Sequence, residues 1–264
     1  MTATTPRRLA TLALLALPAT ALAQESPPAT DAWSLGVGAA VIDSPYAGEG
    51  SRVRPFPLVS YDGERVFLRG ISGGVHLHDS SRFKVDAIVS ARLYGFDIDD
   101  LGRNELIANG LDPSQLSDRD DGLDAGLRAT YVARWGSISL EGLHDITNTS
   151  DGHEISLDYR YTWVRERTAL TTNVGASRLS SDLAGYYFGI LDEEVARGVA
   201  PYQPGSAVIP RIGVTLTKTL GASTWQLIGS AEYQFLPDEL ADSPLLERDR
   251  DGFGRVVFGL SRRF

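Results

Sequence analysis

Polar and apolar residues alternate along most of this chain with a period of two. In the stretch H-E-I-S-L-D-Y-R-Y-T-W, residues 153–163, nearly every odd position is apolar or aromatic and every even position is polar. A strand places successive side chains on opposite faces, whereas a helix would mix these two sets. The segment is therefore predicted to be a β-strand with one polar and one apolar face.

Eleven segments follow this pattern with varying clarity. They are residues 33–42, 53–61, 64–78, 82–94, 123–134, 137–146, 153–163, 168–179, 208–219, 225–235 and 254–264. The connections between them are short at one end of each hairpin, and long at 95–122, 180–207 and 236–253. Short turns on one side and long loops on the other are typical of an outer-membrane barrel.

A secreted β-sandwich is the alternative, because its strands alternate in the same way. The polar face carries charges of both signs, among them Lys84, Asp86, Arg128 and Glu141. In a barrel these side chains would fill a polar lumen and pair across it, whereas in a sandwich they would face water.

The last strand favours the barrel. Counting back from Phe264 in steps of two gives Arg262, Leu260, Phe258 and Val256, an apolar face that ends in a terminal aromatic. This resembles the C-terminal signal that the barrel assembly machinery reads in bacterial outer-membrane proteins. Phe264, Leu260, Phe258 and Val256 are accordingly the predicted assembly signal.

The expected fold is thus an all-β transmembrane antiparallel barrel of 10 to 12 strands. Single-chain barrels have an even number of strands, so the eleven candidates are wrong by one. Either 64–78 is two strands, interrupted at Gly70 and at Gly73-Gly74, or a segment such as 185–191 is an extra one. Twelve strands is the favoured number.

The N-terminus has the features of a secretory signal peptide. Arg7 and Arg8 precede an apolar run, and small residues end at Ala23. This pattern predicts residues 1–23 as signal peptide, 24–32 as a flexible leader and 33–264 as the barrel.

The chain has 34 acidic and 25 basic residues and no Cys. Nucleic acid is therefore an unexpected partner, and disulfides cannot stabilise the fold. The expected surroundings are outer-membrane lipid and lipopolysaccharide.

Three stretches resemble the MipA/OmpV family of outer-membrane proteins, the MltA-interacting proteins. They are G-V-G-A-A-V-I-D-S-P-Y-A-G-E-G with the following R-P-F-P-L-V-S-Y, then Y-Y-F-G-I with P-Y-Q-P-G, then L-P-D-E-L-A-D-S-P-L-L with the terminal strand. The family usually has an aromatic third from the end, where this chain has Arg262. The resemblance implies a scaffold between a lytic transglycosylase and a penicillin-binding protein; the alternative is a small gated or plugged pore.

Candidate chemistry is sparse. His76 and His78 are expected on one face of a strand without a third metal ligand, and His144 and Asp145 are adjacent and so point to opposite faces. The acidic segments 118–122 and 249–252 lack the Glu of a calcium loop and are interpreted as turns. No hydrolase or nucleotide-binding motif is present, so we predict no catalytic residue, cofactor or metal site, and an outer-membrane hydrolase is the least expected function.

The connection 180–207 is the strongest candidate for a functional loop. It is long and contains Tyr186, Tyr187 and Phe188, too many large apolar side chains for a loop that extends into water. We expect it to fold over or into the extracellular mouth as a plug, burying Tyr187 and Phe188, with Arg197 paired to a carboxylate of the lumen or a loop.

Overall fold

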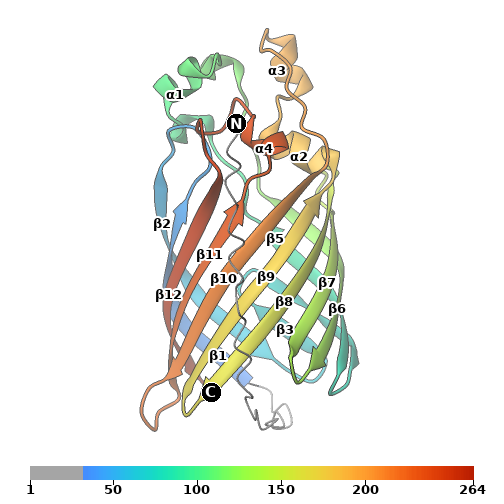
Figure 1. The fold of residues 1–264 in the computed structure, drawn as a ribbon, viewed down its shortest axis with the longest axis vertical. Helices are drawn as coiled ribbons and strands as arrows, with labels where there is room; N and C mark the ends of the chain where they lie inside the picture. Colours follow the sequence, from blue (N-terminus) through green and yellow to red (C-terminus); the bar gives the residue numbers. More distant parts are fainter. Residues whose placement is uncertain (1–31) are drawn as a thin grey trace, which may run out of the picture.

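The computed structural model describes residues 32–264, which form a closed antiparallel barrel of twelve strands (Figure 1). The expected signal peptide, residues 1–23, and nearly all of the expected leader, residues 24–32, lie outside the described residues. The strands are β1 (Ala32–Asp43), β2 (Ser51–Asp62), β3 (Val66–Arg69), β4 (Ser72–Asp79), β5 (Phe83–Arg92), β6 (Gly122–Ala133), β7 (Gly136–Asp145), β8 (His153–Arg165), β9 (Thr168–Leu179), β10 (Ala207–Thr219), β11 (Trp225–Phe235) and β12 (Gly252–Arg263).

Each strand pairs with the next along the chain, and β1 closes the sheet against β12. The closing ladder runs from Ser34 opposite Arg263 to Ile42 opposite Arg255. Closure leaves no free edge at this seam, which matters because lipid cannot hydrogen-bond an open strand. The expected all-β antiparallel barrel is confirmed, with the favoured strand number.

The twelfth strand comes from the division of segment 64–78. A turn at Gly70, where φ is +62°, separates β3 from β4, and glycine adopts this left-handed conformation without steric cost. The other option, an extra strand at 185–191, is wrong: most of that segment belongs to helix α2 (Ser181–Phe188). Ser180 caps this helix, because its side chain accepts a hydrogen bond from the Leu183 amide.

The two faces of the wall differ as the alternation predicts. The outer face exposes large apolar side chains all round the barrel, such as Leu140, Leu157, Val174 and Ile212. The inner face buries polar ones, among them Asp86, Arg92, Asp124 and Asp158. A wall that is apolar outside and charged inside is suited to lipid around it and a polar lumen within it.

The short helices all lie in the connections at one end of the barrel (Figure 1). They are η1 (Ile98–Asp100), α1 (Arg103–Ala108), η2 (Pro113–Gln115), α2 (Ser181–Phe188), α3 (Asp192–Ala196) and α4 (Asp238–Ala241). None of the helices in the described part of the chain is long and apolar enough to span a membrane. By the ordinary asymmetry of such barrels, this end is extracellular and the end with short turns is periplasmic.

The predicted assembly signal lies on the outer face of β12 and runs from Val256 in its extracellular half to Phe264 at the periplasmic end. Phe258 and Phe264 are 62% and 66% exposed, Val256 is also exposed and Leu260 is half-buried. The Phe264 amide donates to the Trp33 carbonyl at 2.9 Å, so the last residue takes part in closure. The Arg262 guanidinium lies 5.1 Å from the Phe264 ring centre.

We predict that deleting Phe264 lowers the yield of assembled barrel severalfold, because both a closing hydrogen bond and the terminal aromatic are lost. The measurement is the heat-modifiable, membrane-inserted fraction on a gel. Phe264→Tyr, which keeps the ring, is the control and should assemble like the parent chain. Equal assembly of the deletion variant and the parent would show that the terminal aromatic is dispensable.

Candidate functional site

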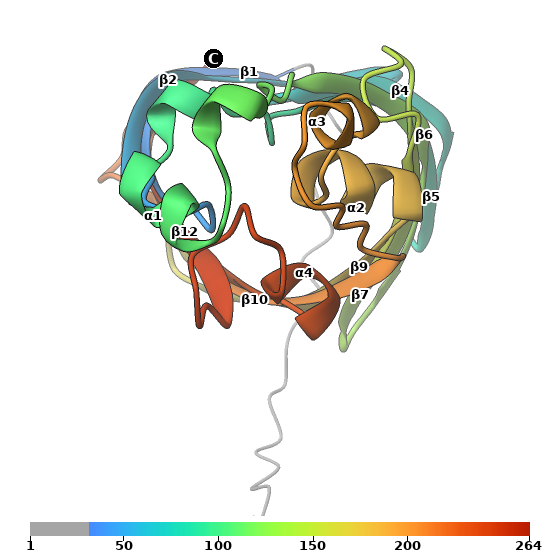
Figure 2. The ribbon, with the colours of Figure 1, turned by 90° about the horizontal axis from the view of Figure 1, so that it is seen from above.

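The three long extracellular connections fold together into a cap with its own apolar core. Segments 93–121, 180–206 and 236–251 contribute most of the cluster. Figure 2 shows α1, α2, α3 and α4 placed over the mouth of the barrel. The core consists of Tyr46, Ala47, Phe96, Leu101, Leu106, Leu111, Leu116, Leu179, Leu183, Ala184, Tyr187, Phe188, Ile190, Val199, Ala207, Ile209, Leu236, Leu240, Leu245 and Leu246.

Helix α2 is the centre of this cap. Tyr187 and Phe188 are almost fully buried, and their backbone carbonyls accept hydrogen bonds from two other connections. The Tyr46 hydroxyl donates to the Tyr187 carbonyl at 3.2 Å, and the Ser243 hydroxyl donates to the Phe188 carbonyl at 2.6 Å. Burial raises the pKa of Tyr46 above its usual value, so this phenol stays neutral and remains a donor.

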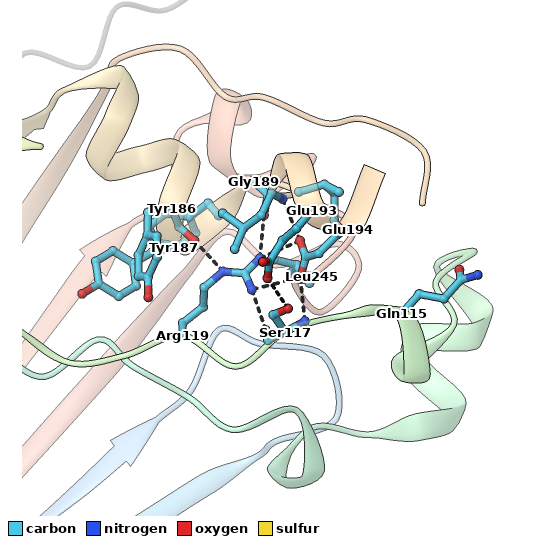
Figure 3. A network of polar contacts seen from close by, with 12 residues as sticks. Gln115, Ser117, Arg119, Tyr186, Tyr187, Gly189, Glu193, Glu194 and Leu245 are labelled. Carbon is cyan, nitrogen blue, oxygen red and sulfur yellow. Dashed lines mark hydrogen bonds and ion pairs between the residues drawn. The ribbon is translucent and has the colours of Figure 1, made fainter. Parts of the chain in front are cut away.

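A buried ion pair fastens the cap. The side chains of Arg119 and Glu194 are both 0% exposed, and two parallel hydrogen bonds of 3.0 and 2.9 Å join guanidinium to carboxylate (Figure 3). Arg119 also donates to the carbonyls of Ser117, Tyr186 and Gly189.

The carboxylate is equally well satisfied. Glu194 accepts from the amides of Ser117 and Leu191 at 2.8 and 2.7 Å, so each oxygen has a partner besides Arg119. A buried pair stabilises a structure only when its remaining polar atoms are also bonded, and removing one partner leaves an uncompensated charge. The pair therefore ties the connection after β5 to the one after β9.

Arg197, the cation singled out in the sequence, lies outside this network core. It is exposed, with its guanidinium 3.7 Å from Glu193 and a hydrogen bond of 2.7 Å to the Gln115 carbonyl. Tyr186 is half-buried, and its hydroxyl accepts a hydrogen bond from the Asp120 amide.

The sequence did not single out Arg119, which lies in the segment D-R-D-D-G that is interpreted above only as a turn. The only indication of its role in the sequence is that Arg119 is a single basic residue in an acidic segment.

Below the cap lies a cavity of about 590 Å³ with a charged wall. Arg92 lies between two carboxylates, 2.6 Å from Asp124 and 2.8 Å from Glu154. Arg128 with Glu141 and Arg255 with Glu232 pair between neighbouring strands, and Arg211 of β10 pairs with Asp158 of β8 across β9. Mixed charges that pair across the wall are what the sequence predicted for the inner face.

A glycine makes one of these pairs possible. Gly175 of β9 is opposite both Asp158 of β8 and Arg211 of β10, so it lies directly between the partners. A Cβ at this position would collide with the Asp158 carboxylate. The absence of a side chain lets the guanidinium reach across β9 to within 2.5 Å of the carboxylate.

Two arginines of the cavity wall differ from the rest. Arg54 on β2 and Arg160 on β8 line the cavity, yet neither has an ion pair with any residue that the structure describes. The wall of the cavity contains seven arginines and six carboxylates, although the chain as a whole has a formal charge of −9. The lumen is thus more basic than the protein around it.

The histidine candidates are separated rather than joined. A bulge between His76 and His78 shifts the register, so His76 pairs with Asp86 and His78 pairs with Val85. The expectation that both share one face is therefore wrong, because the extra residue turns His78 outward beside Phe83. His76 Nδ1 lies 2.6 Å from the Asp86 carboxylate. Among residues 32–264 no group of three or more His, Asp or Glu could hold a metal ion.

His144 and Asp145 also occupy opposite faces. His144 is exposed, whereas Asp145 is buried and accepts hydrogen bonds from the amides of Thr147, Ser150 and Asp151. This carboxylate organises the turn between β7 and β8. The adjacency therefore forms no dyad.

Known proteins are similar to this chain along nearly its whole length. Residues 35–264 match the family described as MltA-interacting protein MipA. The chain is 31% identical to the outer membrane protein YiaT of Escherichia coli, over 96% of this chain and 97% of that one. It is 26% identical to the MltA-interacting protein of Escherichia coli, over 88% and 90% of the two chains. An outer membrane channel from Pseudomonas putida has a TM-score of 0.46 and 11% identity, with 91% and 97% coverage.

We predict that Glu194→Gln loosens the cap without opening the barrel. The substitution leaves the buried Arg119 charge uncompensated, at a cost of about 3 to 5 kcal/mol. The measurement is amide hydrogen exchange over residues 181–199, which should accelerate strongly. Glu193→Gln is the matched control, because this side chain is 60% exposed and its ion pair contributes about 0 to 1 kcal/mol. Equal exchange in the two variants would contradict the assignment of the pair as the fastener.

Proposed function

Because this chain belongs to the MltA-interacting protein MipA family, we propose that it organises the cell envelope as an outer-membrane docking site for a lytic transglycosylase. The name of the 26% identical relative supports an association of this kind, and a penicillin-binding protein is a candidate second partner. The partner would bind the periplasmic end, since murein lies on that side of the outer membrane. The observation that carries the proposal is the charge of that end.

The periplasmic rim is basic. Its short turns and strand ends contain arginines that have no ion pair within the described residues, namely Arg65, Arg82, Arg134, Arg165 and Arg167. Two acidic residues of the rim are already paired, Asp62 with Arg69 and Asp79 with Lys84. Glu64 and Glu166 of the same turns have no ion pair among the described residues either, so the five arginines outnumber the two remaining carboxylate side chains and the rim carries a net positive charge.

The extracellular end has the opposite charge. Segment 93–121 alone contains seven aspartates and one glutamate against two arginines. An acidic partner is thus attracted to one end of the barrel and repelled from the other, and complementary charge sets orientation and association rate more than affinity. The turns are short, so the contact would be at the small end of the range for specific interfaces, below about 1,200 Å².

A charge reversal at the rim tests this proposal. Arg134→Glu with Arg165→Glu should lower severalfold the lytic transglycosylase recovered with the tagged barrel from detergent-solubilised envelope. Arg103→Glu with Arg178→Glu makes the same charge change on exposed arginines near the other end and should leave recovery unchanged. Undiminished recovery with the rim variant, in a barrel that remains heat-modifiable, would refute docking at this rim.

A small gated pore is the second candidate, and the capped cavity favours it. The lumen is charged and hollow beneath the cap, which is the arrangement of a passage for polar solutes. The buried Arg119–Glu194 pair would hold such a passage shut at rest. In this function the cap, with α2 as its plug, is the gate.

Replacing residues 184–200 with a short Gly/Ser linker should raise single-channel conductance in planar bilayers, because Tyr187, Phe188 and Glu194 are then removed from the mouth. Glu193→Gln, which leaves the cap core intact, is the control and should conduct like the parent. If the linker variant folds and its currents equal those of the parent, the cap is not the gate.

A further inference from the structure

The barrel wall is incomplete on one side of β2. Toward β1 this strand is paired along its whole length, but toward β3 only Ser60, Tyr61 and Asp62 have ladder partners. On the side of β3, residues 51–58, the extracellular part of β2, therefore have no strand beside them. The next full-height strand in that direction is β5.

The short β3–β4 hairpin sets the lower edge of this opening. At its tip the Gly70 amide donates to the Val59 carbonyl, and the Ala91 amide donates to the Ile71 carbonyl, each at 3.1 Å. At this level two short strands fill the space between β2 and β5, which is three inter-strand spacings or roughly 14 Å wide. Above the tip no further strand of the described residues continues them, and the connection after β5 reaches the upper end of β2, where Asp100 lies 3.7 Å from Arg52.

The sequence of β2 is adapted to an open edge. The Val59 carbonyl points toward the hairpin, so alternate residues back along the strand, Pro57 and Pro55, direct their backbone nitrogens to the same side. Proline has no amide hydrogen, which is why it is confined to strand edges that need no donor. Two of the groups that lipid would leave unsatisfied are therefore absent.

The cavity passes through this opening to the outer surface. Its lining includes the inward-facing Arg52, Arg54 and Arg92, and also Ile71 and Leu93. Ile71 and Leu93 are 56% and 49% exposed on the outside of the barrel. One continuous space thus has a cationic inner end and an apolar outer end.

Charge at the inner end is available to a ligand. Arg92 is neutralised by Asp124 and Glu154, and Arg52 is paired with Glu49, but Arg54 has no acidic partner among the described residues. The opening begins at the extracellular end of β2, beside the outer leaflet. A molecule that enters there from the membrane must be apolar at one end, and it is best held if it is anionic at the other.

We propose that this lateral opening binds an amphiphile with a single anionic headgroup. The carboxylate or phosphate lies against Arg54, with Arg52 next to it, and the acyl chain leaves the barrel between β2 and β5 along Ile71 and Leu93. The site is independent of docking at the periplasmic rim. It also gives the lumen a route to the membrane that bypasses the cap.

Binding of a fluorescent long-chain fatty acid and of a lysophosphatidic acid to the purified barrel in non-ionic detergent tests the site. Arg54→Gln should weaken both by roughly tenfold, the expected effect of losing a charged hydrogen bond. Arg160→Gln removes the other unpaired lumen arginine and should change neither affinity. If Arg54→Gln weakens the binding of only one of the two probes, Arg54 recognises the headgroup of that probe, either carboxylate or phosphate.

Two further measurements keep the proposal falsifiable. A fatty acid with a photoactivatable group on its chain should label peptides that contain Ile71 or Leu93, and Arg134→Glu with Arg165→Glu should label equally well. An uncharged monoacylglycerol should bind at least several times more weakly than the fatty acid. The proposal is overturned if Arg54→Gln binds as tightly as the parent, if the uncharged analogue binds equally, or if labelling falls elsewhere.

Discussion

Lipid offers no hydrogen-bond partner to a protein backbone, and this constraint governs the wall of the barrel. The seam between β1 and β12 satisfies it by a continuous ladder, in which even the amide of Phe264 has a partner. The upper edge of β2 is the exception. There the constraint is met partly by chemistry rather than by pairing, because Pro55 and Pro57 lack the donors that an unpaired edge would expose.

The protein has two interior regions of opposite character, a polar lumen and an apolar cap core. The lumen is lined with ion pairs such as Arg211 with Asp158, which join charges of strands that lie side by side or one strand apart. The cap is built like the core of a soluble domain, from Leu, Tyr and Phe, with one saturated ion pair at its centre. The cap therefore has an apolar core of its own, separate from the polar lumen below it.

Much of this architecture can be predicted from the sequence. Period-two alternation identifies the strands, and the loop lengths identify the two ends, because both are local properties of the chain. Register is not local: the bulge that separates His76 from His78, the early end of β3 and the reach of Arg211 across Gly175 depend on which strands lie side by side. Arg119 and Glu194 are 75 residues apart, and no spacing rule joins them. Pro55 and Pro57 can be read in the sequence, but their role depends on which edge of β2 their backbone nitrogens face, and this depends on the strand pairing.

The positions of the cap and of the opening determine which routes connect the lumen with the medium and with the membrane. Movement along the barrel axis requires the Arg119–Glu194 pair to part, which leaves two charges in an apolar core. Movement through the wall beside β2 breaks no ladder, since none exists there. The proposed lateral route therefore does not require the cap to open. Because the proposed route lies at the extracellular end, it leaves the arginine-rich periplasmic rim free for the proposed protein partner, and the two proposed functions are compatible in one barrel.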